Sequence, residues 1–178
     1  MKKQLLLSAV IMLLSVVLAA CVQGSTELAP PDIRYGVDVC AQCNMIISDE
    51  RFASAVAYEV GPGRYETAAF DDIGDMLDWA AAHPDQPLVA WYVHDYESKE
   101  WTDATTATYV VTDQVATPMA SGILAFAGAD RADVMAYGLG LKTSDWTTLT
   151  TLHKAGEIGS GAMRQGGGMG GRAPSDGK

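Results

Sequence analysis

The chain has 178 residues, of which 22 are acidic and 12 are basic, and its formal net charge is −10. Nucleic-acid binding requires Lys and Arg side chains clustered on one face, so this composition argues against a nucleic-acid partner. It favours a cationic metal or a basic partner surface instead. The length suits one compact unit or two small lobes that share a core.

The first twenty residues have the pattern of an export signal. Lys2 and Lys3 precede an apolar run, residues 5–20, which is too short for a membrane-spanning helix and leads directly into Cys21. The ending Leu-Ala-Ala-Cys resembles a bacterial lipobox, which implies cleavage before Cys21 and diacylglycerol on its sulfur. We therefore predict residues 1–20 as a lipoprotein signal peptide; an ordinary signal peptide or signal anchor, with Cys21 incidental, is the alternative.

The lipobox also predicts where the mature protein works. Two or three acyl chains at Cys21 would hold it firmly in a membrane. Val22 follows the cysteine, which favours the outer membrane and a periplasmic location if the cell has two membranes. The predicted localisation is the cell envelope, lipid-anchored on the extracytoplasmic side. Removing residues 1–20 takes away two basic side chains and no acidic ones, so the mature charge is 10 − 22 = −12.

Composition and periodicity divide the mature chain into three parts. Residues 21–38 carry Gly and Pro without clear periodicity and are predicted as a flexible lipidated tether. The folded domain is predicted as residues 39–158, an α+β unit with lobes of about 39–98 and 99–158. Residues 159–178 are Gly-rich and are predicted to be a disordered tail, with Met163 and Met169 incidental.

In the first lobe, residues 52–59 and 64–70 predict two strands of a hairpin around the turn Gly61-Pro62-Gly63. Asp71 and Asp72 then stand where they can cap a helix. Its apolar stripe consists of Ile73, Met76, Leu77 and Ala80. Residues 88–95 predict a third strand, which gives the order strand, strand, helix, strand.

The second lobe shows a looser version of this order. Short strands are predicted at 101–104 and 108–112, and an apolar strand is predicted at 122–127. Residues 130–139 predict a helix whose inward side chains would be Val134, Met135 and Tyr137. A last helix is predicted to start near residue 144, with Ser144 as its cap.

The most distinctive stretch is Cys40-Ala41-Gln42-Cys43-Asn44-Met45, which we call the sulfur loop. Two thiols and a thioether within six residues are the soft donors that Cu(I) prefers. A Cys-x-x-Cys turn brings both sulfurs to one side, and Met45 shares a face with Cys43 if the segment is extended. Met119 follows Pro118 in a loop, which is an unusual place for a core methionine.

The other candidate donors carry less weight. Met76 lies on a regular helical stripe and is more typical of a core residue than of a ligand. His94 is expected to make one hydrogen bond at the end of a strand. The histidines lack zinc-finger spacing and Cys-x-x-Cys occurs once, so a four-ligand structural zinc site is weakly supported.

Two other interpretations of the thiol pair stay open. Cys40 and Cys43 could act as a thiol–disulfide oxidoreductase, but such enzymes usually place the pair at a helix N-terminus. Residues 44–49 instead suggest an extended segment followed by a turn. A structural disulfide in a binding lipoprotein would explain the cysteines but not Met45 and Met119.

Five blocks in order resemble the NosL family and span the chain from Cys40 to His153. They are the Cys-x-x-Cys-Asn-Met stretch, Phe70-Asp71-Asp72-Ile73-Gly74-Asp75-Met76, Tyr92-Val93-His94-Asp95-Tyr96, Trp101-Thr102-Asp103-Ala104 and Thr117-Pro118-Met119-Ala120-Ser121-Gly122-Ile123-Leu124-Ala125-Phe126. The family is described as lipoproteins that bind Cu(I) and supply it to nitrous oxide reductase, whose copper–sulfide site is built outside the cytoplasm. Its fold is two related ββαβ lobes.

The resemblance also implies particular site residues. It marks Cys43 and Met45 as ligands, Cys40 as a third or auxiliary thiol, and Met119 as a ligand from the second lobe, so that the ion would lie between lobes. Asn44 and Ala120 stand where glycine is common in the family motif.

Together these patterns predict a membrane-anchored extracytoplasmic Cu(I) carrier and not an enzyme. Its predicted partners are the lipid membrane, through acylated Cys21, and nitrous oxide reductase or its assembly machinery, with no nucleic acid. The predicted metal ligands are Cys40, Cys43, Met45 and Met119. Because a carrier must release its ion by ligand exchange, we expect a partly exposed site of low coordination number.

Overall fold

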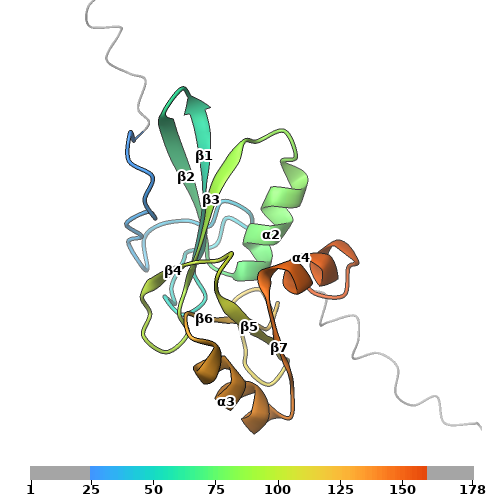
Figure 1. The fold of residues 1–178 in the computed structure, drawn as a ribbon. Helices are drawn as coiled ribbons and strands as arrows, with labels where there is room; N and C mark the ends of the chain where they lie inside the picture. The colour runs from blue at the N-terminus through green and yellow to red at the C-terminus, as the bar shows by residue number, and fades with distance from the viewer. Residues whose placement is uncertain (1–24, 160–178) are drawn as a thin grey trace, which may run out of the picture.

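The fold combines two antiparallel sheets with three helices in the part of the chain, residues 25–159, that this computed structural model describes (Figure 1). The first sheet has the strand order β2-β1-β3-β4 and the second has the order β6-β5-β7. The predicted α+β class is therefore confirmed. In chain order the elements are β1 (Ser54–Gly61), β2 (Arg64–Phe70), α2 (Ile73–Ala82), β3 (Leu88–His94), β4 (Trp101–Asp103), β5 (Thr108–Val111), β6 (Ile123–Phe126), α3 (Ala129–Leu139), β7 (Thr143–Ser144) and α4 (Trp146–Lys154).

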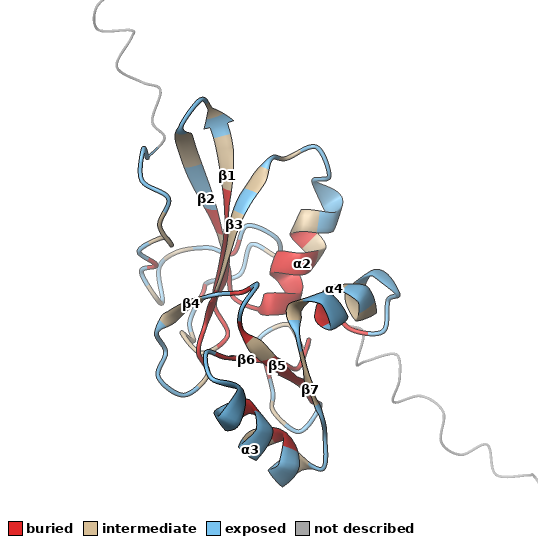
Figure 2. Cartoon of the chain, viewed as in Figure 1, coloured by how far each residue is buried: buried red, intermediate tan, exposed pale blue. Residues whose placement is uncertain are grey.

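The first sheet forms around the hairpin that its turn residues predict. Strands β1 and β2 pair from Ser54 with Phe70 to Gly61 with Arg64, and Gly63 takes the left-handed φ of 66° that glycine tolerates. Helix α2 follows β2 directly and begins at its N-cap, Asp72. Its first turns are buried (Figure 2), including the apolar residues Ile73, Met76 and Leu77.

The second half repeats the topology of the first. β5 and β6 pair as antiparallel strands, α3 follows, and β7 returns to pair with β5 on its free side. In the first half β3 returns to pair with β1 in the same way. Both halves are thus ββαβ units in which the first strand is central, and α4 is added after the second unit.

The second half differs from the sequence prediction in three details. The expected inward residues Val134 and Tyr137 are 61% and 90% exposed, because α3 packs through the small side chains of Ala132 and Ala136. Ser144 lies in β7, so the cap of α4 is Asp145, whose carboxylate accepts from the Thr148 N–H at 2.7 Å. Strand β4 pairs with β3 and belongs to the first sheet.

Much of the predicted tether packs against the domain. The Ser25 N–H donates to the Tyr65 carbonyl at 2.9 Å, and Ile33 is buried in the main core. The Gly36 N–H donates to the Ile47 carbonyl at 2.8 Å. Residues 25–38 are therefore part of the fold, because Ile33 supplies apolar surface to bury and the backbone finds partners.

The chain ends lie outside the described residues. Cys21, with its predicted lipidation, and Met163 and Met169 of the predicted tail belong to these ends. In residues 25–159 none of the helices combines the length and apolar character needed to span a bilayer.

Two left-handed residues coincide with the positions where the family motif commonly has glycine. Asn44 has φ of 60° and Ala120 has φ of 58°. Asparagine tolerates this conformation, whereas the Cβ of alanine makes it unfavourable by roughly 1–2 kcal/mol. Backbone strain is therefore expected at Ala120.

We expect Ala120→Gly to raise the free energy of unfolding by about 1 kcal/mol, because glycine adopts a left-handed φ without a steric cost. Chemical denaturation of the reduced protein measures the change. Ala127→Gly is the matched control, since Ala127 is exposed and lies outside the left-handed region. It should destabilise slightly, and the same result at Ala120 would contradict the inferred strain.

Candidate metal centre

The sulfur loop is held in a tight turn by its own backbone. Val39 and Ile46 form an isolated bridge, and inside it the Cys40 N–H donates to the Met45 carbonyl at 2.8 Å. The Asn44 N–H donates to the Cys40 carbonyl at 3.0 Å, which the left-handed φ of Asn44 allows. The predicted turn is thus present, and it brings the two cysteines to the same side.

A further backbone contact ties this turn to the first sheet. The Ala41 N–H donates to the carbonyl of Ala69, the next-to-last residue of β2. Asp71 and Asp72 follow β2 immediately, and α2 starts at Ile73. The sulfur loop is therefore fixed beside the first turn of α2.

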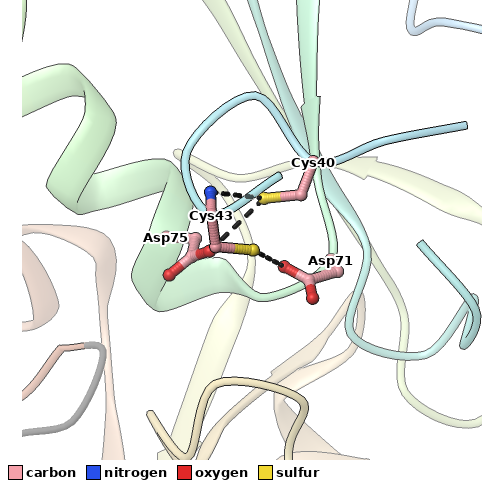
Figure 3. A group of neighbouring side chains, drawn as sticks. All are labelled: Cys40, Cys43, Asp71 and Asp75. Atoms are coloured by element: carbon pink, nitrogen blue, oxygen red, sulfur yellow. Dashed lines mark hydrogen bonds between the residues drawn. The ribbon is translucent and has the colours of Figure 1, made fainter. Parts of the chain in front are cut away.

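The two thiols converge with two carboxylates, Asp71 just before the N-cap of α2 and Asp75 in its first turn (Figure 3). The Cys40 thiol donates to Asp75 Oδ2 at 3.3 Å, and the Cys43 thiol donates to Asp71 Oδ1 at 3.5 Å. One ligand atom from each of the four residues lies within 4.8 Å of the others. Both cysteines are free thiols, so they are available to a metal ion.

Burial sets the protonation of this cluster. Cys40, Asp71 and Asp75 are buried, whereas Cys43 is only partly covered. Desolvation raises the pKa of the Cys40 thiol to about 11 and also raises the pKa of the Cys43 thiol. It raises the pKa of the Asp71 carboxyl as well. At neutral pH both cysteines are therefore protonated thiols, each of which donates to an aspartate oxygen, and the cluster is open on the Cys43 side.

The two predicted methionine donors occupy different surroundings. Met45 closes the sulfur loop and is 53% exposed, while Met119 is partly buried in the second half of the chain. Met76, the doubtful candidate, is completely buried in the main core. His94 is buried too and makes two hydrogen bonds, with the Tyr35 hydroxyl at 2.9 Å and the Lys99 carbonyl at 2.7 Å.

A single buried carboxylate links the segment of Met119 to the thiol cluster. We call residues 117–122 the methionine loop. Asp72 Oδ2 accepts from the Thr117 hydroxyl at 2.7 Å and from the Met119 N–H at 3.0 Å. Asp72 Oδ1 accepts from the Ser121 hydroxyl and from the Gly74 N–H. The methionine loop is therefore hydrogen-bonded to Asp72, the residue that caps α2 and follows Asp71.

Sequence reasoning missed the carboxylate half of this centre. It treated Asp71 and Asp72 together as capping residues, whereas Asp72 alone caps and Asp71 faces Cys43. A partial signal was present, because Asp71 stands directly before the predicted cap and Asp75 stands in the first turn of the helix. Only the fold shows that both carboxylates meet the sulfur loop.

With the geometry established, comparison with known proteins assigns the family. The profile of the NosL family matches residues 35–150, which is more than half of the chain. The chain belongs to the NosL family. The resemblance seen in the sequence is thereby confirmed, and the matched range contains the sulfur loop, the carboxylates and the methionine loop.

A solved structure of a NosL protein supports the fold. The crystal structure of the copper chaperone NosL from Shewanella denitrificans matches with a TM-score of 0.54 at 17% sequence identity. The match covers 69% of this chain and 95% of the other chain. No curated protein sequence matches this NosL-family chain.

We expect Asp72→Asn to lower the free energy of unfolding by about 3 kcal/mol, because an amide cannot accept all the hydrogen bonds of the buried carboxylate. Chemical denaturation of the reduced protein checks this value. Thr117→Val removes one hydroxyl donor of the same network and should cost about 1 kcal/mol. Equal effects of the two substitutions would show that Asp72 does not hold the network together.

Proposed function

We propose that this NosL-family protein is a carrier of Cu(I) and not an enzyme. The observation that carries the proposal is the convergence of two free thiols, Cys40 and Cys43, in a rigid loop with one side accessible. Thiolates are the ligands that Cu(I) selects over harder donors. The similar structure from Shewanella denitrificans is described as a copper chaperone, which supports the same role here.

The methionines would complete a site from which the ion can be transferred. Met45 is exposed at the end of the sulfur loop. Met119 lies on the methionine loop, which is hydrogen-bonded to Asp72, the neighbour of Asp71. Thioether sulfur is a neutral soft donor that an incoming ligand displaces readily. We infer that Cys43 and Met45 form the accessible side of the site and that Met119 contributes from the second lobe.

The rival function, thiol–disulfide exchange, fits the surroundings of the cysteines less well. Redox cysteines of that class are thiolates with a lowered pKa, usually at a helix N-terminus. Here Cys-x-x-Cys lies in a turn between Val39 and Ile46, and burial raises the pKa of both thiols. Such thiols are slow nucleophiles at neutral pH.

The location and the recipient of the copper form the finer part of the proposal. We infer that the lipobox directs acylation of Cys21 and anchors the carrier on the extracytoplasmic face of the cell envelope. The family resemblance supports nitrous oxide reductase, or its assembly machinery, as the recipient. Ser25 pairs with Tyr65 of β2 only four residues after Cys21, so an acylated Cys21 would hold the fold close to the membrane surface.

Anaerobic Cu(I) titration against a competing chelator tests the function. We use the mature chain with Cys21→Ser, so that the sulfur loop supplies the only thiols. We expect one tight site per chain, which Cys43→Ser weakens strongly and Met119→Leu weakens by roughly tenfold. Met76→Leu is the matched control, because this methionine is buried in the core, and it should leave the affinity unchanged.

Absence of Cu(I) binding by the reduced chain would end the copper proposal. Full affinity in Met119→Leu would restrict the site to the sulfur loop. Equal losses in Met119→Leu and Met76→Leu would point to a packing effect and not to coordination.

The raised pKa of the thiols predicts a pH dependence. Each cysteine ligand must lose its proton on binding, so the apparent Cu(I) affinity should rise about tenfold per pH unit for each thiol that coordinates. The rise should continue throughout the neutral range, because the pKa of Cys40 lies at about 11. Titrations between neutral and mildly alkaline pH measure the slope, with the chelator corrected for its own protonation.

The same pH titration of the Cys40→Ser variant gives the number of thiols that coordinate Cu(I), because each one adds to the slope of affinity against pH. If both cysteines bind, the variant should show half the wild-type slope. An unchanged slope would show that Cys40 is auxiliary, and a wild-type affinity that does not vary with pH would contradict thiolate coordination altogether.

A further inference from the structure

A groove of about 800 Å³ lies between the first described residues and the first sheet. Residues 25–31 line one side of it and run alongside β2, where Ser25 pairs with Tyr65 (Figure 1). Residues of β1 and β2 line the other side. None of the lining residues belongs to the sulfur loop, the thiol-facing aspartates or the methionine loop, so the groove is separate from the candidate metal centre.

Thr67 lines this groove, and its backbone groups have no hydrogen-bond partner in residues 25–159. It lies on β2, the edge strand of the first sheet. Tyr65 exchanges two backbone hydrogen bonds with Ser25, and the Ala69 carbonyl accepts from the Ala41 N–H, so Tyr65 and Ala69 direct their backbone groups away from β1. Alternate residues of an antiparallel strand share this orientation, which places the N–H and C=O of Thr67 on the same free edge.

The charges of the groove select a cationic occupant. Glu27 and Glu66 line it and are exposed, whereas its lining contains no Lys, Arg or His. The Tyr58 hydroxyl donates to Glu66 Oε2 at 3.1 Å, which holds this carboxylate in place. Because the chain has a net charge of −10, a second copy of it would be repelled, and so would anionic lipid headgroups. Lys and Arg side chains would be attracted.

The uncharged lining suits the long side chains of Lys and Arg. Leu28 is 44% exposed, and its apolar surface can pack against their aliphatic stems while the charged ends stay near the carboxylates. The ring of Tyr65 lines the same groove and can attract a cation through its π face. Ala57 and Thr67 are paired across β1 and β2, and their small side chains let a backbone approach the sheet closely.

We propose that this groove binds an extended segment of a partner protein that is rich in Lys or Arg. One residue of the segment pairs its backbone with Thr67, in the way that Ser25 pairs with Tyr65. Neighbouring basic side chains then lie beside Glu27 and Glu66. This binding site goes beyond the proposed copper transfer and requires no metal ion.

The test measures fluorescence anisotropy of a labelled probe peptide, Gly-Lys-Val-Lys-Val-Lys-Gly, with the metal-free mature chain carrying Cys21→Ser. We expect saturable binding of one peptide per chain that weakens as salt is added, because the carboxylates are exposed. A peptide with Glu in place of each Lys should not bind.

Charge-neutral variants locate the binding site. Glu27→Gln and Glu66→Gln should each weaken binding about threefold, and the double variant should weaken it about tenfold. Glu157→Gln is the matched control, because Glu157 is also exposed but lies after α4 and does not line the groove. It removes the same charge and should leave the affinity unchanged.

Methylated probes test the pairing with Thr67 from the peptide side. One probe is methylated on its Lys backbone nitrogens and the other on its Val backbone nitrogens. Only alternate residues of a paired strand face β2, so one of these probes should bind about tenfold more weakly than the other. Thr67→Pro removes the N–H from the protein side, where an edge strand tolerates proline, and should also weaken the unmethylated probe.

Four results would overturn the inference. They are no saturable binding of the Lys peptide, equal losses in Glu66→Gln and Glu157→Gln, equal affinities of the two methylated probes, and displacement of the peptide by vesicles of phosphatidylethanolamine, which would assign the groove to lipid. Binding that appears only after residues 160–178 are removed would also contradict it, because the chain itself would then fill the groove. Copper takes no part in these measurements, so this proposal and the copper proposal can each fail alone.

Discussion

The buried carboxylate of Asp72 positions the candidate metal-binding residues, because it joins the start of α2 to the methionine loop. One of its oxygens caps α2 through Gly74, and both oxygens accept from the methionine loop. Because the cap fixes the first turn of α2, it also fixes Asp71 and Asp75 on either side. The same carboxylate thus positions the thiol-facing aspartates of one lobe and the Met119 segment of the other.

A difference between the two ββαβ units explains why, within residues 25–159, the thiol–carboxylate cluster lies in the first unit. Helix α2 has a wide apolar face, so its start is buried under the sulfur loop and can hold carboxylates away from water. Helix α3 packs through Ala132 and Ala136 and remains largely exposed. An equivalent cluster at α3 would be solvated. The second lobe instead contributes the methionine loop and several residues of the main core, among them Tyr109, Ile123 and Leu149.

Local patterns in the sequence were sufficient for β1, β2, α2 and β3 and for the turn of the cysteines, but not for β4 or the packing of residues 25–38. Alternation, the Gly-Pro-Gly turn and an apolar helical stripe report directly on backbone structure. They did not reveal that Asp71 meets Cys43, since that contact depends on how β2 delivers the chain beside the sulfur loop. The exposure of Tyr137 was missed for a similar reason, because small residues of α3 form its contact with the sheet.

Under the proposed copper-carrier function, the protonated state of the cysteines suits a protein that must both hold and give up a soft ion. Loading requires each coordinating thiol to lose a proton, so protons compete with the metal at every stage. Cys40 is buried, whereas Cys43 is partly exposed. A competing ligand would therefore reach the metal–sulfur bond of Cys43 first. When that bond breaks, reprotonation of Cys43 would restore the hydrogen bond that its thiol donates to Asp71. The aspartate that accepts the hydrogen bond of the thiol would therefore favour departure of the proposed ion from the accessible side.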